Sequence, residues 1–234
     1  MKLRIKFSKH GVLKFIGHLD VMRYFQKAIR RAGIDICYSS GFSPHQIMSF
    51  AAPLGVGLES NGEYMDIEVN SIISTEAVKD ALNKQMVDGI EVLEVTLLPE
   101  NAGNAMASVA AAAYTIKFRE GYKPEFLDAS AISRFYKEQE EIIVTKKTKR
   151  SESTFDIKPF IYKMEYIDET AAISLIVDAS SANNIKPTLV MKAFYEMNNA
   201  QLDEFGLLIT REETYMNVGD EENRVLKPLG YIRN

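Results

Sequence analysis

The order of predicted strands and helices occurs twice along this chain, and this repetition limits the fold more than any other sequence feature. Alternating polar and apolar residues predict strands, and apolar residues at helical spacing predict helices. The first series runs strand, helix, strand, strand, helix, strand. Its strands are predicted at 2–7, 34–38, 64–69 and 90–97, and its helices at 18–32 and 75–87.

The second series has the same order with one more strand between its two helices. Its strands are predicted at 113–119, 142–148, 157–166, 171–177 and 207–215, and its helices at 124–139 and 187–196. This order is typical of the split βαβ, or ferredoxin-like, unit. We therefore predict an α+β fold of two tandem ferredoxin-like lobes, at 1–98 and 110–234, joined by a small, polar linker at 99–109.

The first lobe contains a long segment rich in glycine and proline at 39–63. Such composition argues against regular structure. Its apolar residues, including Phe42, Ile47 and Phe50, need burial and argue against disorder. We expect a functional loop, since long loops in compact domains usually serve function.

Cys37 is the only cysteine of the 234 residues, so no intramolecular disulfide can form. A reducing, cytoplasmic location is the expectation. No apolar run approaches the length of a membrane span, and residues 1–11 alternate charged and apolar residues rather than forming a signal peptide.

Positive charge gathers at the amino-terminal end although the whole chain carries a net charge of −4. Residues 1–50 contain nine Lys and Arg, two Asp and all three histidines. This uneven distribution of charge predicts a localised surface that binds anions. The alternative is an arginine-rich helix that is only solvated.

On the predicted helix at 18–32, the cations Arg23, Lys27, Arg30 and Arg31 share one side. Leu19, Met22, Phe25, Gln26 and Ile29 fall on another side, which we expect to pack inward. The cationic side suits phosphate groups of RNA. The aromatic motif of RNA-recognition domains is absent, so the alternative remains a solvated face.

A second basic segment lies in the predicted hairpin at 145–160, where four cations are close in sequence: Lys146, Lys147, Lys149 and Arg150. A basic turn can bind phosphate, and lysines also protect exposed edge strands from aggregation.

Polar residues at the start of the helix and in the long loop form the candidate catalytic group. His18, Asp20 and His45 could perform acid–base chemistry, with Arg23 beside them. They could also hold a divalent metal, but their spacing fits no standard zinc or calcium loop, so we predict no metal. The alternative is helix capping and a loop histidine bound to backbone. Ser39, Ser40 and Asp156 are expected to organise loops.

Several short motifs occur in the order found in one bacterial family. They are the His-Leu-Asp-x-x-Arg run from His18 to Arg23, Tyr38-Ser39, Gly41-Phe42-x-Pro44-His45, Pro53-Leu54-x-Val56-Gly57, the basic segment ending at Asp156 and Pro159, and REETYMN near the C-terminus. In these motifs the chain resembles the radical-SAM-linked proteins (DUF2344). It departs at Gln46, Ile47 and Lys158, where the family has proline, a basic residue and arginine.

The resemblance implies an accessory or substrate-handling role beside a separate radical SAM protein. A radical SAM cluster needs three thiolates from its own chain, so the cluster and SAM are expected on the partner, and no cofactor on this chain. We expect a non-catalytic protein that binds RNA or another anionic substrate through the first lobe. The alternatives are a nuclease- or transferase-like enzyme using His18 and His45, and a purely structural protein–protein adaptor.

Overall fold

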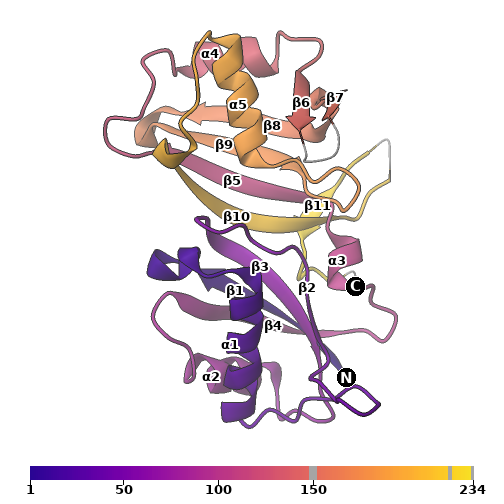
Figure 1. Cartoon of the computed structure of the whole chain (residues 1–234). Helices are drawn as coiled ribbons and strands as arrows, with labels where there is room; N and C mark the ends of the chain where they lie inside the picture. Colours follow the sequence, from indigo (N-terminus) through magenta and orange to yellow (C-terminus); the bar gives the residue numbers. More distant parts are fainter. Residues whose placement is uncertain (148–151, 221–222, 233–234) are drawn as a thin grey trace. The chain divides into compact units, whose positions relative to one another are not determined.

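A computed structural model describes residues 1–147, 152–220 and 223–232, and it has an α+β fold with a large mixed sheet (Figure 1). The chain forms two compact units. The first unit is Met1–Ala110 with Arg211–Asn234, and the second is Ala111–Thr210. Within the described residues, no helix is both long and apolar enough to cross a membrane.

The first unit carries α1 and α2 against a sheet of strands in the order β4-β1-β3-β10, and β1 is antiparallel to both β3 and β4. β2 also pairs with β3, and β11 pairs with β10. The elements are β1 (Lys2–Lys9), a 3-10 turn (Gly11–Phe15), α1 (His18–Arg31), β2 (Met48–Phe50), β3 (Glu59–Glu68), α2 (Thr75–Asn83), β4 (Ile90–Leu98), α3 (Ala105–Ser108), β10 (Leu207–Asn217) and β11 (Leu226–Pro228).

One face of β1 and β3 forms the core of the first unit. Leu3, Ile5 and Phe7 alternate along β1 and are buried. α1 packs on this face, and the Phe25 ring lies 4.7 Å from that of Phe7 between centroids. The residues of α1 that are buried are Val21, Phe25, Ala28 and Ile29. The expected inward face was therefore partly wrong, because Leu19 is 59% exposed and Val21 is buried instead.

The opposite face of β1 carries buried charge rather than an apolar core. Arg4 pairs with Asp66 through two hydrogen bonds of 2.7 and 2.9 Å, and both side chains are buried. Arg4 also donates to the carbonyl of Leu229, while Asp66 accepts from the backbone of Ala105. The expected linker at 99–109 thus contains the short helix α3, tied to the sheet by Asp66.

Residues 211–234 belong to the first unit, whereas the sequence placed them in the C-terminal lobe. The contacts of β10 with β1 and β3 give the reason. Glu213 pairs with Lys6 at 2.6 Å and accepts from the Tyr64 hydroxyl at 2.8 Å. The Thr214 hydroxyl donates to the carbonyl of Gly62. The part of β10 from Arg211 onward therefore belongs to the first unit.

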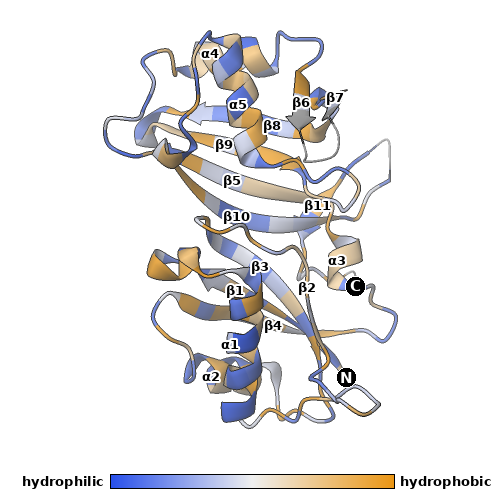
Figure 2. Cartoon of the chain, viewed as in Figure 1, coloured by the Kyte–Doolittle hydropathy of each residue, from blue (hydrophilic) through white to orange (hydrophobic). Residues whose placement is uncertain are grey.

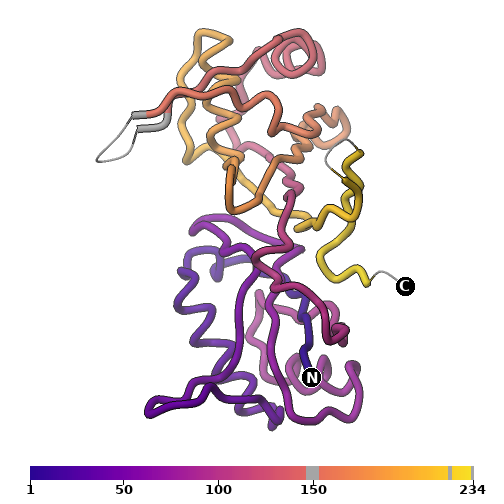
Figure 3. Tube along the Cα trace, turned by 90° about the vertical axis from the view of Figure 1, so that its right-hand side faces the viewer, coloured from indigo at the N-terminus to yellow at the C-terminus, as the bar shows by residue number. Residues whose placement is uncertain are grey.

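The second unit has its strands in the order β10-β5-β9-β8, with α4 and α5 after β5 and β9 in the chain. β6 and β7 form a separate two-stranded hairpin, visible in Figure 3. Phe135 of α4 and Phe194 of α5 are buried with ring centroids 5.4 Å apart. The elements are β5 (Ala111–Phe118), α4 (Ala129–Tyr136), β6 (Ile143–Lys147), β7 (Glu152–Asp156), β8 (Ile161–Ile167), β9 (Ala172–Asp178), α5 (Pro187–Met197) and 3-10 turns at Lys158–Phe160, Asp168–Thr170 and Glu204–Gly206.

The expected strand at 34–38 is wrong, since only isolated bridges join Ile36 to Val69 and Tyr38 to Gln46. The segment still bonds to its neighbours, but through single backbone pairs: the Cys37 amide donates to the carbonyl of Glu68, and the amide of Ile47 donates to the carbonyl of Cys37. The long loop at 39–63 is more regular than expected, because β2 lies within it and β3 begins at Glu59.

Candidate functional site

The cationic side of α1 is exposed as the helical spacing predicted. Arg23, Lys27 and Arg30 are all exposed, and Figure 2 shows the outer side of α1 as hydrophilic. Arg23 lies 3.5 Å from Asp20, an exposed pair of the kind that contributes little to stability. Arg31 donates to the backbone and side-chain oxygens of Gln85 at 3.4 Å. Two cations of this face, Lys27 and Arg30, have no hydrogen-bond or ion-pair partner among the described residues.

His45 is exposed in the segment between α1 and β2. Its Nδ1 is 2.8 Å from the Ser39 hydroxyl, which also accepts from the His45 backbone at 3.1 Å. Ser39 therefore organises this segment, and Ser40 beside it is exposed. The alternative expectation was a loop histidine bound to backbone, whereas the His45 ring is bound to the Ser39 side chain.

His18 is the first residue of α1 and lies in a different setting from His45. Its ring packs edge-on against Phe50 of β2, with centroids 5.0 Å apart. In the described part of the chain no hydrogen bond or ion pair joins His18 to Asp20 or His45, and the Asp20 carboxylate accepts from Arg23 instead. Each of the three acid–base candidates from the sequence thus contacts a different partner.

His18 instead lines a small recess at the edge of the helix-facing core. The recess has a volume of about 10 Å³, room for about one water molecule. Lys9 and Glu63 line the recess with His18, and both are almost fully buried, with 2% and 5% of their surface exposed. The remaining lining residues are apolar: Phe7, Val21, Phe50, Pro53 and Leu54.

Strand pairing explains why two charged side chains enter this recess. Phe7 is paired with Glu63, so both lie at the same level of neighbouring strands. The pairing of β1 with β3 is irregular between Phe7 and Lys9, at the end of β1. Lys9 therefore lies at the rim of the apolar face, next to the start of α1.

Arg211 of β10 completes the charged cluster around Glu63. Its guanidinium donates to Glu63 at 2.9 Å and to the carbonyl of Ala52 at 2.8 Å, and the Ser60 hydroxyl donates to Glu63 at 2.7 Å. The Lys9 ammonium has one described hydrogen bond, a long one of 3.4 Å to the carbonyl of Ile16. Burial lowers the pKa of Lys9, the Arg211 charge lowers it further, and the Glu63 charge opposes both. We call Lys9, His18, Glu63 and Arg211 the recess cluster.

In the sequence, Lys9 stood out only as part of a basic stretch, Arg211 only as the first residue of the REETYMN motif, and Glu63 not at all. A signal was nevertheless present. Lys9 continues the odd-numbered series of Leu3, Ile5 and Phe7, and Arg211 continues that of Leu207 and Ile209. A charge at an inward-facing strand position is unusual, because burying it requires a partner.

The basic hairpin is only partly described. Lys146 and Lys147 belong to β6, opposite Ser153 and Glu152, whereas Lys149 and Arg150 lie outside the described residues. Asp156 lies at the base of the hairpin. Its carboxylate accepts from the backbone of Ile142 at 2.7 Å and of Lys158 at 2.9 Å, an arrangement that organises both chain segments.

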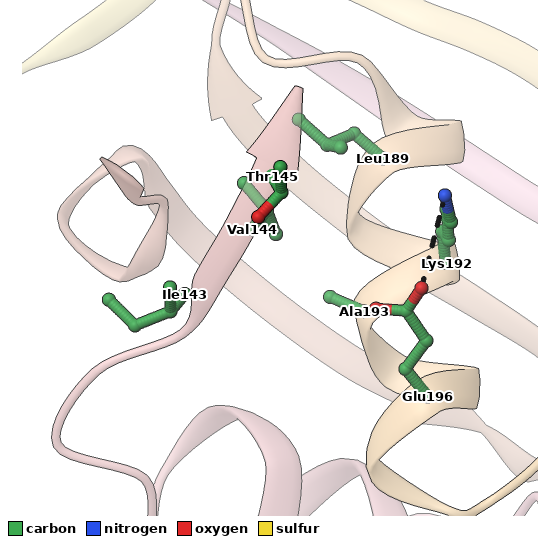
Figure 4. A pocket seen from close by; sticks show the side chains of 7 residues that line it. All are labelled: Ile143, Val144, Thr145, Leu189, Lys192, Ala193 and Glu196. Atoms are coloured by element: carbon green, nitrogen blue, oxygen red, sulfur yellow. Dashed lines mark ion pairs between the residues drawn. The ribbon is translucent and has the colours of Figure 1, made fainter. Parts of the chain in front are cut away.

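A larger cavity of about 470 Å³ lies between β6 and α5 in the second unit (Figure 4). Ile143, Val144 and Leu189 form its apolar part. Its two charged residues, Lys192 and Glu196, face each other at 3.9 Å and are largely exposed. The positive charge of Lys192 is therefore balanced by Glu196, and the cavity lining does not favour an anion. In the parts of the chain that the structure describes, no three His, Cys, Asp or Glu side chains lie close enough to hold a metal ion.

Comparison with known proteins identifies the family but not an activity. The sequence profile of one family matches residues 2–187. The chain belongs to DUF2344. This family is described as an uncharacterized protein conserved in bacteria. The match extends from β1 to the first residue of α5 and so includes three members of the recess cluster.

No curated protein matches this member of DUF2344. Among solved structures, it is similar to a chain from the crystal structure of a Cbf5-Nop10-Gar1 complex. The identity is 10% and the TM-score 0.47, over 91% of this chain and 48% of the other. The chain thus spans about half the length of that relative.

Proposed function

We propose that this DUF2344 protein is a non-catalytic substrate-handling partner of a separate radical SAM enzyme, and that it binds RNA through the cationic side of α1. The observation that carries the proposal is the exposure of Arg23, Lys27 and Arg30 on one helix. Lys27 and Arg30 lack a described carboxylate partner, so they are available to phosphate groups. Other polyanions would be bound by the same chemistry and are an outcome of the test.

The enzyme alternative receives less support from the geometry. A pair of histidines acting as acid and base must both reach one substrate. His18 packs on Phe50, whereas His45 is bound to Ser39 in an exposed turn. The adaptor alternative has no specific contact in its favour within the described residues.

The radical SAM partner rests on the family resemblance together with the cysteine content. One cysteine cannot provide the three thiolates that such a cluster needs, so the cluster would belong to another polypeptide. Cys37 is half-buried, and its thiol donates to Asn70 at 3.1 Å. A reducing, cytoplasmic setting fits this single thiol.

The finer fold assignment, two tandem ferredoxin-like lobes, is part of the same proposal. Strand orders β4-β1-β3-β2 in the first unit and β10-β5-β9-β8 in the second support it. Each order brings together strands that a split βαβ unit would pair. In such a unit the helices cover one sheet face, and α1 would present its cations on the outside of that layer.

Binding of a single-stranded RNA at several salt concentrations tests the proposal. A Lys27→Ala/Arg30→Ala variant loses up to two phosphate contacts. The slope of log affinity against log salt should then fall in magnitude by about 1.4, since each contact contributes about 0.7 on a single strand. The matched control is Lys117→Ala, which removes an exposed cation of β5 in the second unit.

Unchanged RNA affinity and salt slope in the double variant would remove the proposed surface. An equal loss with Lys117→Ala would show that only net charge matters. Stronger retention of heparin than of RNA at matched salt would replace RNA by another polyanion. Cleavage or modification of RNA by the chain alone, lost in His18→Ala, would replace the binding role by an enzymatic one.

A further inference from the structure

Four apolar side chains are exposed around the start of α1 in the first unit. Each has more than half of its surface exposed, and they are Val12, Phe15, Leu19 and Val56. Val12 and Phe15 are three residues apart in the 3-10 turn, where such residues stand on the same side. The Gly57 amide donates to the carbonyl of Lys14 at 2.8 Å and brings Val56 beside this turn. We call these four residues the apolar patch.

The 3-10 turn holds the Phe15 ring in a fixed setting. The Lys14 ammonium lies over this ring, 5.6 Å from its centre, and is itself paired with Glu59 at 3.4 Å. The backbone of the turn is bonded to Gly57 on one side, and the amide of His10 just before it donates to the carbonyl of Gly89 at 2.8 Å. With 63% of its surface exposed, Phe15 therefore presents a preorganised flat apolar surface to solvent.

The apolar patch continues into the cations of α1. Leu19 lies in the first turn of α1 and shares one side of the helix with Arg23, Lys27 and Arg30, within about 80° of arc at 3.6 residues per turn. Leu19 and Arg23 are one turn apart, with about 6 Å between their Cβ atoms. The row from Leu19 to Arg30 is about 16 Å long. A narrow row of side chains thus runs from an apolar end to a cationic end.

This row restricts the partner that fits it. The cations favour an anionic partner, and the exposed ring favours a flat apolar one. A nucleic-acid single strand has both features, because proteins that bind such strands combine a cationic track with aromatic side chains on which bases stack. In a duplex the base faces are already stacked and cannot reach Phe15. A membrane-binding helix carries its apolar face along its whole length, whereas the exposed apolar group of α1 is at one end.

We propose that the apolar patch is a docking site for an unpaired base, with Phe15 as the stacking platform, and that the RNA bound along α1 is single-stranded. The other three residues of the patch surround the stacked base and exclude water from it. This inference rests on the proposed function, because the cations of α1 hold the phosphates that place the base at Phe15.

Affinity for a short fluorescent oligouridylate, measured by anisotropy, tests the docking site. Phe15→Ala should weaken binding by about 5- to 100-fold, the range for the loss of one stacked base. The slope of log affinity against log salt should stay unchanged, since no phosphate contact is lost. Phe15→Tyr keeps the ring and should keep most of the affinity. The matched control is Phe205→Ala, which removes a ring of the second unit that is 65% exposed.

A strand of the same length built from stable abasic nucleotides gives the second comparison. Its phosphates are the same, so the unmodified chain and Phe15→Ala should bind it equally. The unmodified chain should bind oligouridylate about 5- to 100-fold more tightly than the abasic strand, a comparison that needs no variant. Equal affinity for the two strands overturns the docking site, as does an equal loss in Phe205→Ala.

The failure of this inference is distinguishable from that of the proposed function. If Lys27→Ala/Arg30→Ala lowers the salt slope while Phe15→Ala leaves oligouridylate affinity unchanged, the RNA surface stands and the base-docking site is wrong. If the double variant leaves the salt slope unchanged, both are wrong. Loss of binding to phosphatidylserine vesicles in Phe15→Ala, with RNA affinity unchanged, would replace the base by a lipid surface.

Discussion

Arg211 donates to the Glu63 carboxylate over 2.9 Å, and the two side chains are 7% and 6% exposed. The residues are 148 positions apart in sequence, yet they form one of the most deeply buried ion pairs described in the first unit. Arg211 is also bound to the carbonyl of Ala52, so it connects β10 to the loop that covers the recess.

Replacing Arg211 with Met should lower the free energy of unfolding by about 3–5 kcal/mol, because the buried Glu63 carboxylate loses the guanidinium that is hydrogen-bonded to it. Urea unfolding followed by circular dichroism measures the loss. Lys192→Met is the matched control, because it breaks a pair with Glu196 that is 57% and 60% exposed. It should lose no more than about 1 kcal/mol. Equal losses would mean that the Arg211 pair is solvated.

Because of Asp178, the free energy of unfolding should decrease as the pH falls into the acid range. Burial favours the neutral acid and would raise the pKa of Asp178. Hydrogen bonds from Ser180, Tyr162 and Asn183 outweigh burial and lower this pKa below its usual value. A carboxylate whose pKa is lower in the folded state stabilises the fold above the unfolded-state pKa of about 4, and this stabilisation is lost as pH falls through the folded-state value.

Asp178→Asn should therefore flatten the decline of the unfolding free energy between about pH 4 and pH 2. Denaturant melts at pH intervals across this window provide the measurement. A variant at exposed Glu169, Glu169→Gln, should keep the slope of the unmodified chain. The same slope in Asp178→Asn would show that other carboxylates govern acid unfolding.

Gly89→Ala should be much more destabilising than Gly33→Ala. Both glycines have positive φ, +93° and +67°, and either substitution loses about 1 kcal/mol from backbone strain. A Cβ on Gly89 would also lie 2.7 Å from the carbonyl oxygen of His10, whereas one on Gly33 meets nothing within 4 Å. Melting midpoints of the two variants check the order, and similar midpoints would contradict the close approach.

Asp156→Ala should destabilise the base of the β6–β7 hairpin by about 1–3 kcal/mol, because the half-buried amides of Ile142 and Lys158 lose their acceptor. Hydrogen exchange of peptides covering 140–147 and 152–160 should accelerate. Asp156→Asn retains one acceptor oxygen and should restore most of the protection. Unchanged exchange in Asp156→Ala would indicate that the two amides have other acceptors.

Much of the local structure followed from sequence alone. The helix at 18–32 was confirmed as α1, since its spacing, its acidic first turn and Gly33 beyond its end are all local signals. A proline at the start of the segment 187–196 likewise predicted the helix that the structure shows as α5. The exposure of the α1 cations also followed, because helical periodicity alone assigns them to one side.

Tertiary structure decided the recess. Lys9, Glu63 and Arg211 come from three strands, and only the pairing of β1 with β3 and of β3 with β10 brings them together. It also decided the surroundings of the two histidines, because His18 packs on Phe50 whereas His45 is exposed and bound to Ser39. Periodicity reports which side of an element is buried, but not which distant element covers it, because that depends on strand register across the whole chain.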